Sequence, residues 1–176
     1  MTDRLELPDG SVYTVLERPE DPAREPLVME FVLAPGATAP PPHFHPNGQV
    51  ESFGVTQGWF ELLVDKEWKR VNAGETVEVP PGTRHTFRNE SGAKTHVRNV
   101  HAPAHDFEEY IRGIHALATH YGATAPTNPV VAAKYARLIK QFDSTIVLSD
   151  VPARAGVTAL AALAKVLRLE LPTTAS

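Results

Sequence analysis

Residues 74–89 read GETVEVPPGTRHTFRN, and this stretch decides the fold. Gly74, Pro80 and Gly82 are typical of turns, because glycine accepts positive φ angles and proline fixes φ near −65°. His85 follows the last of these turn residues. The chain after it is rich in residue types that favour strands. The pattern therefore predicts a turn that places His85 at the start of a β-strand.

A second stretch, residues 36–58, reads GATAPPPHFHPNGQVESFGVTQG. His43 and His45 are two residues apart, so on an extended chain both side chains face the same way. Glu51 lies at even spacing from His45 and can face inward with it if the chain between them stays roughly extended.

These side chains predict a metal site. A β-barrel brings inward-facing residues of facing strands together, so His85 can join the first group around one ion. Three neutral imidazoles and one carboxylate suit a divalent transition metal: Fe, Mn, Co, Ni, Cu or Zn. We predict His43, His45, Glu51 and His85 as the metal ligands. Glu51 is also the candidate catalytic residue, as a proton acceptor.

The spacing of glycine and proline up to Pro103 predicts an all-β sandwich or barrel. Glycine and proline recur there at short intervals between runs rich in Val, Phe, Thr and Leu. Gln57-Gly58 and Asp65-Lys66 are expected to form tight hairpin turns, and Gly74 another turn. The expected strands are Ser11–Arg18, Pro26–Leu33, Gln49–Thr56, Trp59–Val64, Trp68–Val71, Thr76–Val79, His85–Asn89 and Thr95–His101.

After Pro103 the hydrophobic period changes from two to 3.6, which predicts helices. Asp106 with Glu109 resembles a capping box, and Asn128-Pro129 is expected to begin a second helix. A third helical segment is expected after Gly156. We therefore divide the chain into a barrel with the metal site, residues 1–103, and a C-terminal helical extension, residues 104–176. The extension is expected to pack on the barrel or on a second subunit.

The two stretches resemble the paired motifs of the cupin superfamily, whose members are small jelly-roll β-barrels. The first motif is matched by His43, His45, Glu51 and Gly58, with slightly longer spacing before His43 and before Glu51. Gln49 sits at one of the motif's usual offsets and is the alternative to Glu51. We favour Glu51, since an anionic oxygen binds a dication better than a neutral amide. The resemblance covers roughly residues 10 to 103. The second motif is matched without a gap by Gly74, Pro80, Gly82, His85 and Asn89.

The resemblance implies a mainly β fold, a cupin jelly-roll barrel with a C-terminal helical extension. It implies a metal-dependent oxidoreductase, similar to quercetinase-like dioxygenases, acting on a small aromatic or diketone-like compound. Two alternatives stay open. One is a redox-neutral isomerase or lyase in which the metal is a Lewis acid. The other is a non-catalytic cupin that binds or senses a small molecule.

Further side chains are expected around the site. The barrel mouth would be lined by Phe44, Phe53, Val55 and Phe87 or their neighbours, which suits a small organic ligand. Asn99 and His101 share one face of a strand. If that face points inward, these two residues can support the ligands or contact the substrate.

The amino-acid composition argues against some classes of binding partner. The 176 residues include 17 Lys and Arg against 21 Asp and Glu, so an acidic chain is a poor partner for nucleic acid or anionic lipid. It contains no cysteine, which excludes disulfides and thiolate ligands. Residues 1–10 lack the apolar core of a secretory signal, and we expect a soluble cytoplasmic protein. We also expect a homodimer, through the apolar faces of Tyr110–Tyr121 and Val131–Phe142 or the outer sheet face.

Overall fold

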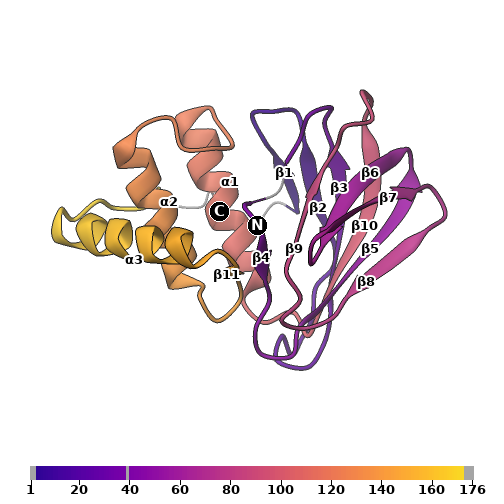
Figure 1. The fold of residues 1–176 in the computed structure, drawn as a ribbon, viewed down its shortest axis with the longest axis horizontal. Helices are drawn as coiled ribbons and strands as arrows, with labels where there is room; N and C mark the ends of the chain where they lie inside the picture. Colours follow the sequence, from indigo (N-terminus) through magenta and orange to yellow (C-terminus); the bar gives the residue numbers. More distant parts are fainter. Residues whose placement is uncertain (1–2, 39, 173–176) are drawn as a thin grey trace.

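Two antiparallel β-sheets face each other in the computed structural model, which describes residues 3–38 and 40–172 (Figure 1). Residues 1–2 of the predicted barrel segment and residues 173–176 of the predicted helical extension therefore lie outside the described residues. One sheet has the order β1-β2-β3-β10-β5-β8 and the other β11-β4-β9-β6-β7. The strands are β1 (Arg4–Glu6), β2 (Val12–Glu17), β3 (Leu27–Leu33), β4 (His43–Phe44), β5 (Val50–Gln57), β6 (Trp59–Val64), β7 (Glu67–Asn72), β8 (Thr76–Val79), β9 (His85–Arg88), β10 (Thr95–Ala102) and β11 (Val147–Leu148).

The predicted mainly β fold is confirmed, and all eight predicted strands are present with ends within one residue of those expected. Three short strands, β1, β4 and β11, were not predicted. The Asp65-Lys66 hairpin is confirmed, because Val64 pairs with Glu67 and Asp65 has a φ of 55°. The predicted Gln57-Gly58 hairpin is wrong. It connects β5 to β6, and these strands belong to different sheets.

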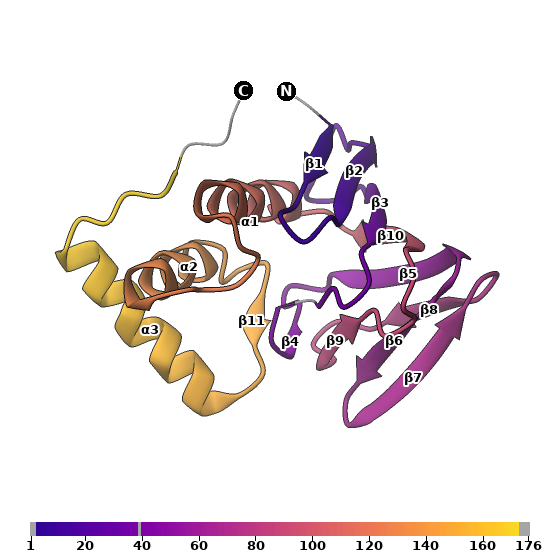
Figure 2. The ribbon, with the colours of Figure 1, turned by 90° about the horizontal axis from the view of Figure 1, so that it is seen from above.

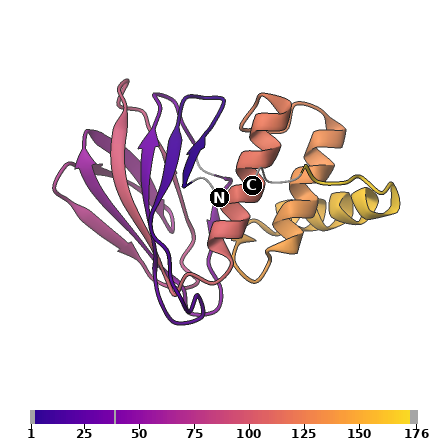
Figure 3. The same cartoon turned by 180° about the vertical axis from the view of Figure 1, so that it is seen from behind.

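Three helices follow the barrel strands: α1 (Phe107–Tyr121), α2 (Pro129–Gln141) and α3 (Val151–Val166). Helix α1 lies beside the barrel, α2 comes next and α3 lies furthest out (Figures 2 and 3). The apolar faces of α1 and α2 are buried in the same core as the barrel, with Tyr110, Leu117 and Val131 each 1% exposed. These faces are therefore covered within the chain, and the homodimer stays a prediction.

The helix starts test three sequence predictions. The Asn128 side chain accepts hydrogen bonds from the amides at the start of α2, so this cap is confirmed. Asp106 precedes α1 but makes no side-chain cap hydrogen bond, so the predicted capping box is wrong. The start of the third helix is also wrong, since Gly156 lies inside α3. That helix begins at Val151, where the Asp150 side chain accepts from the amide of Ala153.

The helical extension is tied to the barrel by charge as well as by apolar packing. The Arg18 guanidinium at the end of β2 donates to both carboxylate oxygens of Glu108 in α1, at 2.8 Å each. Burial opposes ionisation of Glu108, but hydrogen bonds from Arg18 and Arg112 keep the pKa of this carboxyl below its usual value. Within the described part of the chain, no helix is both long and apolar enough to cross a bilayer.

Gly58 lies in the turn between β5 and β6, and its replacement tests whether this connection between the two sheets requires glycine. Its φ of +79° is unfavourable for other residues, and an added Cβ would lie 3.0 Å from Thr95 Oγ1 and 3.2 Å from the Lys94 carbonyl oxygen. We expect Gly58→Ala to lower the free energy of unfolding, measured in urea, by about 1–3 kcal/mol. Gly156→Ala is the matched control, because nothing lies near that position in α3. It should raise stability by about 0.5–1 kcal/mol; equal effects of both variants would contradict the prediction.

Candidate metal centre

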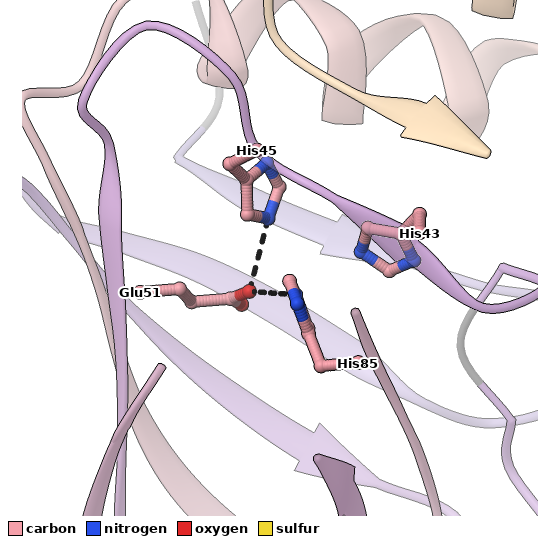
Figure 4. A group of neighbouring side chains, drawn as sticks. All are labelled: His43, His45, Glu51 and His85. Carbon is pink, nitrogen blue, oxygen red and sulfur yellow. Dashed lines mark hydrogen bonds and ion pairs between the residues drawn. The ribbon is translucent and has the colours of Figure 1, made fainter. Parts of the chain in front are cut away.

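Four side chains from three strands and one loop meet inside the barrel (Figure 4). His43 lies on β4 and His45 just after it, Glu51 comes from β5, and His85 begins β9, where it pairs with His43. One nitrogen or oxygen atom from each lies within 4.8 Å of the others, and all four residues are buried. The structure thus brings together the four residues that the sequence predicts as ligands.

A backbone carbonyl fixes the orientation of each imidazole. Because a carbonyl oxygen only accepts, each ring must donate its Nδ1–H, and in the neutral ring this leaves the Nε2 atom with a free lone pair. In metal sites, such bonds hold histidine in the tautomer that binds the ion. The Nδ1 to oxygen distances are 3.0 Å for His43 to Pro41, 2.7 Å for His45 to Thr145 and 2.8 Å for His85 to Thr83.

Glu51 supplies the test of whether these residues fit a cation. Its Oε2 atom lies 3.0 Å from His45 Nε2 and 2.8 Å from His85 Nε2. If both rings are neutral and donate from Nδ1, each contact joins an acceptor nitrogen to an acceptor oxygen, and a positive charge, either a proton or a metal ion, is needed between them. Three imidazole nitrogens and one carboxylate oxygen form a donor set that transition-metal dications prefer. The cluster can therefore hold a metal ion.

The charge states of Glu51 and His43 suit a metal, whereas contacts with Glu51 raise the pKa of His85 despite its burial. Burial opposes the charge on Glu51, but His101, His45 and His85 hold the pKa of this carboxyl well below its usual range. Burial, reinforced by His85 and His45, places the pKa of His43 well below its usual value. A metal ligand must be deprotonated. The carboxylate and the His43 imidazole therefore meet that requirement at neutral pH.

Gln49, the alternative to Glu51, is engaged elsewhere. Its Nε2 donates to the carbonyl oxygens of Pro103 at 2.7 Å and Ala104 at 3.0 Å, and its Oε1 lies 3.3 Å from His101 Nδ1. These contacts orient the amide and keep it out of the cluster. The geometry therefore supports Glu51 as the carboxylate of the site.

Asn99 and His101 on β10 both contact Glu51. Asn99 Nδ2 donates to Glu51 Oε1 at 2.8 Å, and His101 Nε2 lies 3.2 Å from the same oxygen. The inward orientation that the sequence left conditional is confirmed. Burial lowers the pKa of His101 to about 4, so its imidazole is neutral at physiological pH. His101 also stacks on Phe107, with 3.3 Å between ring centroids.

The turn and strand residues of the second stretch have structural roles. Gly82 has a φ of 73°, and its amide donates to the His45 carbonyl oxygen at 2.9 Å, which joins the turn before His85 to the first histidine pair. Asn89 is buried, and its Nδ2 donates to the carbonyl oxygens of Leu33, Ala34 and Ala93. Both residues hold the frame around the cluster.

Comparisons with known proteins identify the barrel. Residues 29–101 match a family model described as a cupin domain. The barrel is a cupin domain. A comparison with curated proteins found no match.

Solved structures are similar to this chain at low sequence identity. KdgF from Halomonas sp. is 20% identical over 60% of this chain and 90% of its own, with a TM-score of 0.52. The Cupin_2 domain of an XRE family transcriptional regulator from Enterobacter cloacae is 26% identical over 52% of this chain and 95% of its own, with a TM-score of 0.45. A cupin 2 conserved barrel domain protein from Salinispora arenicola is 23% identical over 56% of this chain and 80% of its own, also with a TM-score of 0.45.

A small cavity adjoins the cluster in the cupin barrel. Its volume is about 40 Å³. Of the four residues expected at the mouth, only Phe87 lines it. Phe44 alternates with His43 and His45 and so faces away from them, whereas Phe53 and Val55 lie in the apolar core. The lining residues are Tyr13, Phe31, Pro40, His43, His45, Glu51, Phe87, Phe107, Tyr110, Ile111 and Ile146.

Four cavity residues come from the helical extension, and sequence reasoning did not assign them to the site. Phe107, Tyr110 and Ile111 lie on α1, and Ile146 precedes β11. Their apolar spacing signals a buried helix face, but nothing in that spacing says which surface the face covers. The cupin barrel and its extension thus form one pocket together.

The loop before β11 holds the extension against the first histidine pair. Thr145 supplies the carbonyl for His45, and the Asn47 side chain donates to the Ser144 carbonyl oxygen at 2.9 Å. Strand β11 then pairs with β4, with Leu148 opposite His43. A residue a hundred positions along the chain therefore orients a candidate metal ligand.

Proposed function

We propose that this cupin is a metal-dependent oxidoreductase of the dioxygenase type, acting on a compact diketone-like compound. The observation that carries the proposal is the convergence of three imidazoles and one carboxylate at the edge of a cavity with mostly apolar walls. The predicted ligand set, His43, His45, Glu51 and His85, would hold one divalent transition metal.

Cavity size favours a narrow substrate. An engineered apolar cavity of about 150 Å³ takes up benzene. The cavity here measures about 40 Å³. An aromatic ring would therefore require the walls to move, whereas an acyclic carbonyl compound is narrower. This comparison supports the diketone-like substrate over the aromatic one.

The chain's own residues would handle the proton and exclude water. A bound redox-active ion would supply oxygen chemistry and stabilise an enolate. Glu51, charged and held at Oε1 by Asn99, is placed to accept a proton from an acidic C–H group. Phe31, Phe87 and Ile111 keep the reacting carbon away from bulk water. In the overall reaction, a 1,3-diketone and O₂ give a carboxylic acid and an α-oxo aldehyde.

The test loads the purified protein with Fe²⁺, Mn²⁺, Co²⁺, Ni²⁺ or Cu²⁺ and measures O₂ uptake with pentane-2,4-dione. We expect one O₂ consumed per diketone cleaved. Glu51→Gln removes both the proton acceptor and an anionic ligand, and it should lower the rate by at least the 10²–10⁴-fold that a general base usually contributes. Glu78→Gln, at an exposed position of β8, is the control and should keep full activity.

Two results would support the alternatives instead. Turnover that continues without O₂, with Zn²⁺ bound, would indicate a redox-neutral isomerase or lyase. Tight binding of a small molecule without turnover in a broad screen would indicate a binding or sensing protein. Either result would contradict the dioxygenase proposal.

A further inference from the structure

Buried polar atoms without partners gather around the cupin pocket. Among the described residues, four side-chain atoms are buried without a hydrogen bond: Asn99 Oδ1, His101 Nε2, Tyr110 Oη and Thr145 Oγ1. Asn99 and His101 contact Glu51, the Thr145 carbonyl holds His45, and Tyr110 lines the cavity. An unmade hydrogen bond at a buried group costs about 1–3 kcal/mol. Of these four residues, Tyr110 is the one that lines the cavity, and a buried hydroxyl without a partner there points to a polar ligand.

Tyr110 differs from the other three residues. It lies on α1, outside both cupin motifs, and is 1% exposed. The rings of Phe107 and Phe142 flank it, each with a centroid 6.0 Å away, so the Tyr110 ring packs among apolar rings. Burial, with smaller contributions from the Tyr13 and Tyr135 phenols, raises the pKa of the Tyr110 hydroxyl, which therefore keeps its proton at neutral pH. A protonated phenol in an apolar cavity is a hydrogen-bond donor that lacks an acceptor.

The net charge of a metal-loaded site and the volume of the cavity indicate which kind of ligand would accept this hydrogen bond. A dication held by one carboxylate and neutral imidazoles leaves one net positive charge next to the cavity, which favours a monoanion. The remaining walls, such as Phe31, Phe87 and Ile146, suit a short hydrocarbon group. The space of about 40 Å³ limits the bound part to a few heavy atoms. A short carboxylate or enolate has all three properties.

We propose that Tyr110 donates a hydrogen bond to an oxygen of a small organic anion, a short carboxylate or enolate, bound in this cavity. The inference rests on the proposed metal site and narrows its substrate class. It makes Tyr110 a binding residue that the helical extension supplies to the cupin barrel.

The test compares Tyr110→Phe with Tyr121→Phe, a phenol on α1 outside the cavity lining. Co²⁺ binding is measured by calorimetry. Acetate is then titrated into each Co²⁺-loaded protein and followed by the visible Co²⁺ spectrum. We expect Tyr110→Phe to bind Co²⁺ within twofold of the wild type but to bind acetate about ten- to a hundred-fold more weakly, as expected for a hydrogen bond to a charged group. Tyr121→Phe should match the wild type in both measurements.

Thermal stability separates a binding role from a structural one. Removing a hydroxyl that has no partner should leave the melting temperature of the acetate-free protein unchanged or higher. Equal acetate affinity in the wild type and Tyr110→Phe, with Co²⁺ bound, would overturn the inference about Tyr110 alone. A Co²⁺-loaded wild type that binds no acetate would overturn the small-anion class. A wild type that does not take up Co²⁺ would overturn the metal site itself, and the inference with it.

Discussion

His85→Ala is expected to weaken divalent-metal binding by more than about 100-fold. Loss of a group that only hydrogen-bonds to a metal ligand already lowers metal affinity by about 10–100-fold, and this variant removes a ligand itself. At a free metal concentration 100 times the Kd, the wild type gains about 2.7 kcal/mol. For a chain of this size, that corresponds to a rise in melting temperature of about 5–10 °C. Calorimetry with Co²⁺, and melting curves with and without Co²⁺, measure both effects.

His120→Ala is the matched control, since His120 is exposed near the end of α1. It should retain wild-type metal affinity and the full thermal shift, and a chelator should reverse the shift in both proteins. Equal Co²⁺ affinity in His85→Ala and His120→Ala would show that the ion binds somewhere other than the buried cluster.

Strand positions in the barrel could be predicted because their signals are local. Turn residues and alternating apolar side chains located every predicted strand to within one residue. Sheet membership is not local, and this explains the error at Gln57-Gly58. Two adjacent strands with a glycine between them resemble a hairpin, but β5 pairs with β8 and β10 while β6 pairs with β7 and β9. The short strands β4 and β11 escaped prediction because two residues carry no periodicity.

The sequence could predict the candidate metal ligands of the site, but not the residues that line the cavity beside them. The spacing of His43, His45, Glu51 and His85 carries information about strand faces, and the four residues do converge. Which helix face covers the pocket depends on tertiary docking, which spacing does not encode. For that reason Phe87 was correctly placed at the cavity, whereas the contribution of Tyr110 and Ile146 required the structure.

Ile146→Ala is expected to lower the free energy of unfolding by about 2–5 kcal/mol and to weaken Co²⁺ binding about tenfold. Ile146 is 1% exposed and packs into both the common core and the cavity wall, so its truncation leaves a void. The preceding residue holds His45 through the Thr145 carbonyl at 2.7 Å. Loosening this loop therefore frees the His45 ring. A hydrogen bond that orients a metal-binding histidine contributes about 10–100-fold to metal affinity. Urea unfolding measures the first effect and calorimetry the second.

Two further variants separate the loop from general destabilisation. Val166→Ala removes carbon atoms from a residue of the same extension that is 77% exposed. The free energy of unfolding and the Co²⁺ affinity should therefore both stay near wild type. Ile146→Val keeps most of the wall and should cost about 0.5–1.5 kcal/mol with little change in Co²⁺ affinity. If Ile146→Ala loses stability while binding Co²⁺ as tightly as Val166→Ala does, the extension covers the cupin pocket without orienting its ligands. A loss of affinity that follows the size of residue 146 would instead make the extension part of the metal centre, because the same loop would then link helix docking to imidazole orientation.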